Sequence, residues 1–177
     1  DGQTETAISI YSNVNPINLE TYYEFSNIKR TFYDIDFTHR FTSIKILNKE
    51  KSIFLNDEIA KIKINFYSQK EDKRLCVRMI IFYVDDTPLG MTTTDPVIES
   101  KKGENEMILS FDTSLIAKGT YKVRLVLYTI NKFGTEKIYD VIDNAFTFEK
   151  NIDQSVINNM NWNHSVWGHC FLPKLKC

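Results

Sequence analysis

The fold is decided by the stretch Lys118-Gly119-Thr120-Tyr121-Lys122-Val123-Arg124-Leu125. On both sides of its glycine, apolar residues occupy every second position. Before the glycine these are Met107, Leu109 and Phe111, and after it they are Tyr121, Val123, Leu125 and Leu127. A period of two is typical of β-strands that turn one face to a hydrophobic core. The sequence therefore predicts two long strands that flank a turn at Gly119.

The spacing of Gly119 and Tyr121 resembles the tyrosine corner of immunoglobulin-like sandwiches. In that arrangement a tyrosine near the start of a strand points inward, and its hydroxyl bonds to the backbone a few residues upstream, which fixes the crossover between two sheets. We therefore predict an all-β, immunoglobulin-like antiparallel β-sandwich. Residues 4–11 show a threonine start signal and helical apolar spacing, and they predict a short N-terminal helix.

Composition limits the possible partners. A chain of 177 residues, 42% of them hydrophobic, can form one domain with a full core and a modest appendage. A net charge of -1 argues against a nucleic-acid partner or an anionic membrane bound through bulk electrostatics. Three cysteines cannot all pair within one chain, and their wide spacing favours reduced thiols in the cytosol.

The remaining strands follow from alternation and from turn residues. We expect strands at 41–48, 60–66, 75–84, 91–94, 138–141 and 145–149, with a final strand within 162–172. Residues 20–40 are rich in aromatics without a clear period and predict an extended segment over the sandwich, and residues 151–161 predict a loose connection. The strand at 75–84 is apolar on both faces. Either it is buried on both sides, or a ligand or partner covers its second face.

Several phrases of the chain carry a family resemblance. Residues 1–11 combine a glycine, acidic residues, a small apolar helix and a tyrosine. Gly119-Thr120-Tyr121 precedes a long strand, and residues 139–148 are followed by Trp167-Gly168 and by the closing residues 172–175. In this order the phrases resemble the ATP-binding subunits of polysaccharide ABC exporters, the Wzt type of O-antigen exporters. Residues 1–11 are similar to the end of their nucleotide domain, and the rest is similar to their C-terminal domain.

The resemblance implies a function, partners and domain limits. Domains of this family are β-sandwiches that bind the non-reducing end of a lipid-linked polysaccharide without altering it, and so select it for export. They form homodimers that exchange a C-terminal strand, which would lie here at 166–172 within residues 162–177. Residues 1–19 would be the end of a nucleotide-binding domain and its linker, and residues 20–177 the carbohydrate-binding domain.

The same resemblance places the full-length protein at the cytoplasmic side of the bacterial inner membrane, with the exporter's transmembrane subunit as a partner. The chain has no phosphate-binding Gly-x-x-x-x-Gly-Lys-[Ser/Thr] motif, so we do not expect it to hydrolyse ATP or to act as an enzyme.

Strand parity identifies candidate sugar-binding residues. If Tyr121 points inward, its neighbours Lys122 and Arg124 point outward, and the outward face of the strand at 75–84 should lie beside them. The carbohydrate-binding candidates are Arg78, Phe82, Arg124 and Tyr128. Sugars stack their C–H faces on aromatic rings and accept hydrogen bonds from guanidinium groups. The alternatives are that these residues are cross-strand packing pairs, or that the exchanged strand covers them.

Other residues carry weaker chemical signals. His39, His164, His169 and Cys170 lack metal-ligand spacing, and Asp85, Asp86 and Asp95 fit a turn better than a calcium loop. Asp140 and Asp143 could be paired acids for glycoside cleavage, but they need not share a face. We interpret Trp162 and Trp167 as core or dimer contacts. The sequence therefore predicts no metal, no cofactor and no catalytic residue.

Two other classes of function stay open on the sequence alone. A structural or adhesive β-sandwich would have the same strands, and so would an accessory module of a carbohydrate-active enzyme. A nucleotide-binding domain encoded before Asp1 would favour the exporter. A secretion signal there would favour the adhesive module instead.

Overall fold

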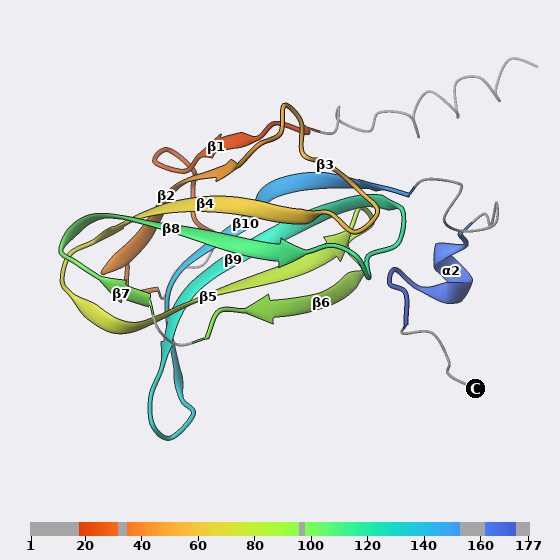
Figure 1. The fold of residues 1–177 in the computed structure, drawn as a ribbon. Coiled ribbons are helices and arrows are strands. Elements are labelled where there is room, and N and C mark those ends of the chain that lie inside the picture. The colour runs from red at the N-terminus through yellow and green to blue at the C-terminus, as the bar shows by residue number, and fades with distance from the viewer. Residues whose placement is uncertain (1–17, 32–34, 96–97, 153–161, 173–177) are drawn as a thin grey trace, which may run out of the picture.

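The computed structural model describes residues 18–31, 35–95, 98–152 and 162–172, which form two stacked β-sheets (Figure 1). The first sheet has the order β1-β2-β4-β8, with bounds Tyr22–Glu24, His39–Ile46, Ile59–Ser68 and Gly103–Asp112. The second has the order β3-β10-β9-β5-β6, with bounds Ile53–Leu55, Glu136–Asn151, Gly119–Ile130, Asp72–Tyr83 and Pro88–Thr93. Strand β7 (Ile98–Ser100) also pairs with β5. Every pairing is antiparallel except that of β3 with β10, so the predicted all-β sandwich is confirmed.

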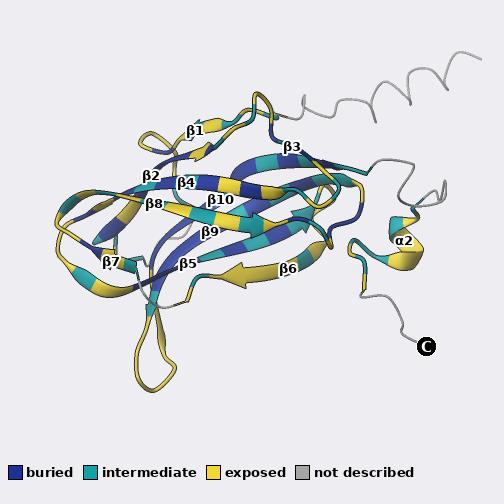
Figure 2. Ribbon diagram, viewed as in Figure 1, coloured by how far each residue is buried: buried dark blue, intermediate teal, exposed yellow. Residues whose placement is uncertain are grey.

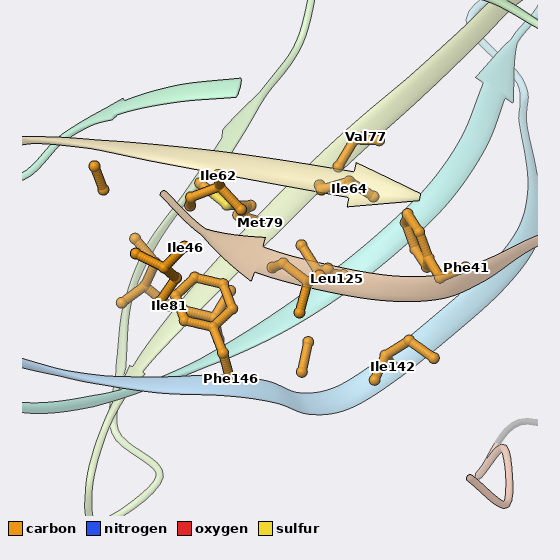
Figure 3. Close-up of a cluster of buried hydrophobic side chains, with 14 of the residues drawn as sticks. Phe41, Ile46, Ile62, Ile64, Val77, Met79, Ile81, Leu125, Ile142 and Phe146 are labelled. Carbon is orange, nitrogen blue, oxygen red and sulfur yellow. The ribbon is translucent and has the colours of Figure 1, made fainter. Parts of the chain in front are cut away.

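The core lies between the two sheets. Along β4, Ile62 and Ile64 are buried while Lys61 is exposed. Figure 2 shows buried and exposed stretches alternating along this strand. The labelled side chains in Figure 3 come from both sheets and meet in one cluster, with Ile62 and Ile64 from the first and Met79 and Leu125 from the second. Burying one such side chain contributes about 1.5–3 kcal/mol. The period-two pattern thus specifies which face of each strand packs inward.

The predicted tyrosine hydrogen bond is confirmed. Tyr121 is fully buried, and its hydroxyl donates to the carbonyl oxygen of Ala117 at 2.8 Å. Gly119 allows this close packing, because a Cβ atom there would lie 2.8 Å from the Tyr83 ring. The hydroxyl and the glycine together fasten the start of β9 against the core.

One continuous strand replaces two predicted ones. Instead of separate strands at 138–141 and 145–149, β10 runs from Glu136 to Asn151 and pairs with β9 along its length. Its register shifts between Ile142 and Phe146. Asn144 lies in this shift with φ at +50°, a conformation that asparagine tolerates better than most residues. The break expected between 141 and 145 is therefore an irregularity within a single strand.

The segment at 20–40 lies against the sandwich, as expected, and it contacts both sheets. Residues 22–24 form β1 on the edge of the first sheet, and Phe25 is buried in the core. Further along, Ile35 packs against the outer face of the second sheet. The segment therefore crosses from one layer of the sandwich to the other.

The predicted strand within 162–172 is wrong for this chain. Residues His164–Trp167 form the short helix α2, and beyond it Cys170 makes a single bridge with Ile116. Asn163 caps the helix through a hydrogen bond from the Ser165 amide, and Gly168, at φ +74°, ends it. The sequence reading missed Asn163 as a helix cap, which is a role that asparagine side chains often take.

Two sequence expectations lie outside the described residues. These are the N-terminal helix at 4–11 and most of the connection at 151–161. Within the residues that the structure describes, no helix has the length and hydropathy that a membrane crossing would require.

Candidate functional site

The outer face of the second sheet carries a groove of about 660 Å³. Apolar and charged side chains line it in equal number. The apolar ones are Ile35, Ile80, Val126, Ile138 and Val141, and the charged ones are Asp36, Arg78, Arg124, Glu136 and Lys137. Beneath the groove, Cys76, Val126, Tyr128 and Val141 form a second buried cluster, against which Ile35 and Ile80 pack. We call this site the outer groove.

Arg78 is held in position by two neighbours. Its guanidinium carbon lies 4.5 Å from the centroid of the Tyr128 ring, and its Nη2 atom bonds to the carboxylate of Glu136. The Tyr128 hydroxyl is itself bonded to Oγ1 of Thr93 at 2.6 Å. The pKa of Arg78 is raised, mainly by its hydrogen bond to Glu136, so the guanidinium stays charged. The ring and the carboxylate together restrict the arginine to one orientation.

Arg124 has an equivalent arrangement one strand away. Its guanidinium carbon lies 5.2 Å from the centroid of the Phe82 ring, and its Nε atom bonds to the carboxylate of Asp143. Strands β5 and β9 pair so that Ile80 lies opposite Arg124. This register brings the two arginines to the same groove from neighbouring strands.

The structure brings all four sequence-predicted site residues to one sheet face. Arg78 and Arg124 line the outer groove. Phe82 and Tyr128 lie next to the groove, and the ring of each packs against the guanidinium group of its arginine; Tyr128 is only 5% exposed. A ring that is so deeply buried offers no face to a ligand. Tyr128 therefore supports Arg78, as the packing alternative stated, whereas both arginines keep contact with the groove.

Sequence reasoning missed the walls of the groove. Asp36 and Lys137 form an ion pair at 2.6 Å between the 20–40 segment and the start of β10. Hydrogen bonds from Lys137 and Thr38 lower the pKa of Asp36 to about 2. The register of the β9–β10 hairpin also places Ile138 opposite Tyr128. Asn131 and Gly134 indicate a hairpin turn at 131–134, and counting outward from that turn would have predicted the position of Ile138.

The other chemical candidates have structural partners. Asp140 is fully buried and accepts hydrogen bonds from Arg30 and from the Phe41 amide, whereas Asp143 binds Arg124 on the outer face. They do not form an exposed acid pair. His164 and His169 do meet, with 2.8 Å between their Nδ1 atoms. Within the described ranges, no group of three histidine, cysteine or acidic residues has metal-binding geometry.

Comparisons with known proteins show a likeness of fold. The crystal structure of the C-terminal domain of Wzt aligns with a TM-score of 0.63 and 10% identity, over 90% of this chain and 96% of that domain. A Niemann-Pick type C2 protein from the Japanese carpenter ant aligns with a TM-score of 0.44 and 13% identity, over 71% of this chain and 98% of its own. No family model matches the chain, and no curated protein sequence matches it. The chain therefore shares the fold of the Wzt domain.

Proposed function

We propose that the outer groove binds the non-reducing end of a lipid-linked O-antigen or related polysaccharide without altering it, and thereby selects the polysaccharide for export. The observation that carries the proposal is the pair of oriented arginines beside an apolar surface. Arg78 and Arg124 present guanidinium groups, and Ile80, Val126 and Val141 present aliphatic surface in the same groove. The likeness of fold to the Wzt C-terminal domain supports this choice of ligand.

The chemistry of the groove suits a sugar. A sugar ring has apolar C–H groups and several hydroxyl oxygens, so it needs both aliphatic contact and hydrogen-bond donors. Each arginine is already held by an aromatic ring and a carboxylate. Binding then costs less side-chain entropy than it would with freely moving arginines. The groove is therefore a preorganised surface for one or two terminal sugars.

The proposal extends to partners and location. The chain would act as the C-terminal domain of an ATP-binding subunit, with residues 1–19 as the end of the nucleotide-binding domain and its linker. It would work as a homodimer beside the exporter's transmembrane subunit, at the inner face of the inner membrane. Residues 162–177 would be the segment that two copies exchange. In the structure, its described residues contact the same chain through the bridge between Cys170 and Ile116.

A calorimetric titration tests the proposed function. The probe is the polysaccharide extracted from the source organism, used intact and after removal of its terminal sugar. We expect the intact chain to bind and the trimmed chain to bind at least about tenfold more weakly, a change of about 1.4 kcal/mol. Equal affinity for both probes, or no binding of either, would contradict the proposal. Lys61→Ala serves as the control variant, because Lys61 is exposed on the first sheet.

A further inference from the structure

The loop between β9 and β10 presents the most exposed aromatic side chain among the described residues. Phe133 is 81% exposed, at the tip of a hairpin that projects beyond the sheets (Figure 1). A single exposed apolar residue is common on protein surfaces and indicates nothing alone. Three further features of the hairpin point to a role for Phe133 in binding.

First, the loop is held in one conformation. The Oδ1 atom of Asn131 accepts hydrogen bonds from the amides of Phe133 at 2.9 Å and Thr135 at 3.0 Å. The backbone adds two more bonds, between Asn131 and Thr135 and from Gly134 to Asn131, each at 3.0 Å. Gly134 has φ at +81°, which a glycine adopts without strain. The loop therefore presents the ring from a preorganised backbone.

Second, the hairpin continues the outer groove. Glu136, Lys137 and Ile138 line the groove on the β10 side, only a few residues after Phe133. In the register, Ile138 lies opposite Tyr128, and Glu136 lies opposite Ile130, two pairs nearer the tip and therefore on the same face. Opposite residues share a sheet face. Partly exposed apolar surface thus runs from Ile138 through Ile130 toward Phe133.

Third, a cationic side chain lies over the Phe133 ring. The Nζ atom of Lys132 lies 5.0 Å from its centroid. The face of an aromatic ring is electron-rich and attracts cations and polarised C–H groups alike. Sugar rings carry several such C–H groups on one side. The ring and the ammonium group together offer a stacking surface and a hydrogen-bond donor.

We propose that Phe133 is a second sugar subsite, which stacks on the sugar units that follow the terminus of the glycan. This inference rests on the proposed function of the outer groove. The terminal sugars occupy the groove between Arg78 and Arg124, and the rest of the chain leaves along the β9–β10 hairpin. The hairpin then sets the direction in which the polysaccharide leaves the domain.

The test compares two probes of different length. One is the intact polysaccharide of the source organism, and the other is a fragment with its one or two non-reducing terminal sugars. Each probe is titrated into the unaltered chain and into the variants Phe133→Ala and Phe133→Trp. The control is Ile108→Ala, because Ile108 is 57% exposed and lies on β8 of the first sheet, away from the hairpin and the outer groove. We expect Phe133→Ala to weaken the intact polysaccharide roughly threefold to tenfold. Its affinity for the short fragment should not change, and Phe133→Trp should retain both affinities.

Each contrary outcome has a distinct meaning. If Phe133→Ala leaves the affinity for the intact polysaccharide unchanged, or weakens both probes equally, the second subsite is overturned while the groove stands. If the unaltered chain binds neither probe, the proposed function fails and this inference fails with it. Vesicles of anionic phospholipid provide the last comparison. Binding to them that is lost in Phe133→Ala would assign the hairpin to a membrane and overturn the sugar subsite.

Discussion

Arg30 and Asp140 form a buried, two-pronged ion pair between segments that are far apart in the chain. The Arg30 Nε and Nη2 atoms bond to the two carboxylate oxygens of Asp140 at 2.8 and 3.0 Å. Their side chains are 6% and 0% exposed. The remaining donors of Arg30 bind the carbonyl oxygens of Phe25, Ile28 and Phe41. The pair fastens the 20–40 segment to β10.

Removing Arg30 should therefore destabilise the domain strongly. Arg30→Ala leaves the Asp140 carboxylate buried without its cation, and we expect a loss of about 3–5 kcal/mol in the free energy of unfolding. Urea denaturation measures this loss. The control is Lys63→Ala, because the ion pair between Lys63 and Glu106 is partly exposed to solvent and should contribute less than about 1 kcal/mol. Similar losses in both variants would contradict this assignment.

Removing the Tyr121 hydroxyl should lower the free energy of unfolding by less than removing Arg30. Tyr121→Phe keeps the ring in the core but removes the hydroxyl that donates to Ala117. We expect the free energy of unfolding to fall by about 0.5–1.5 kcal/mol, the net contribution of one hydrogen bond, with the fold unchanged. Thermal unfolding followed by circular dichroism measures it. A variant as stable as the unaltered chain would show that the hydroxyl does not hold the corner.

The C-terminal segment should dock less firmly in acid. Tyr83 stacks on His169, and the amides of Ala117 and Phe171 bond to the carbonyls of His169 and Leu115. Burial lowers the pKa of His169 below 6.5, the nearby His164 lowers it further, and Asp85 opposes both. The docked state therefore prefers the neutral ring. The stabilisation of the docked segment by the neutral His169 ring is complete above pH 6.5 and declines as the pH falls through the lowered pKa of His169.

Nuclear magnetic resonance can measure both parts of this prediction, because the chain has only three histidines. We expect the His169 ring to titrate below pH 6.5. The amides of Ala117 and Phe171 should also exchange faster in acid, after correction for the intrinsic rate. His169→Gln, which does not titrate, should remove the pH dependence. A His169 pKa above 6.5 in the folded chain would contradict the predicted direction.

The outer groove predicts a graded loss of glycan affinity. Arg124→Ala removes a charged donor, and we expect at least about tenfold weaker binding of the polysaccharide, because hydrogen bonds from charged groups contribute about 1.5–3 kcal/mol. Phe82→Ala should weaken binding less, since Phe82 acts by orienting Arg124. Both residues are partly exposed, so the melting temperature should change little. Unchanged affinity in both variants, or a loss of affinity in step with stability, would support the packing alternative.

Local periodicity explains what could be predicted from the sequence. Alternation specified which residues of β4 and β9 face the core, and the glycine-x-tyrosine spacing specified the hydrogen bond of Tyr121. Parity also placed Arg78 and Arg124 on one face correctly, because β5 and β9 are neighbours. Such features depend on residues that are near in sequence or on strands whose pairing follows a common topology.

Contacts between distant segments could not be predicted in this way. The ion pair of Arg30 and Asp140 and the approach of Ile35 to the groove depend on the path of an irregular segment. The burial of Tyr128 depends on the side chains of neighbouring strands, such as Arg78, which packs over its ring. The C-terminal helix was missed because two tryptophans and a short apolar run indicated a strand, although Asn163 and Gly168 supply the cap and the stop for a single helical turn.

Chemical-shift mapping tests the central claim most directly. The ¹⁵N-labelled chain is titrated with the short non-reducing terminal fragment of the source organism's polysaccharide, and each amide is followed. The account predicts saturable shifts around Arg78 and Ile80 on β5, Arg124 and Val126 on β9, and Val141 on β10. Amide shifts confined to β4 and β8 of the other sheet would contradict the account. So would the absence of amide shifts with a fragment that binds the chain by calorimetry.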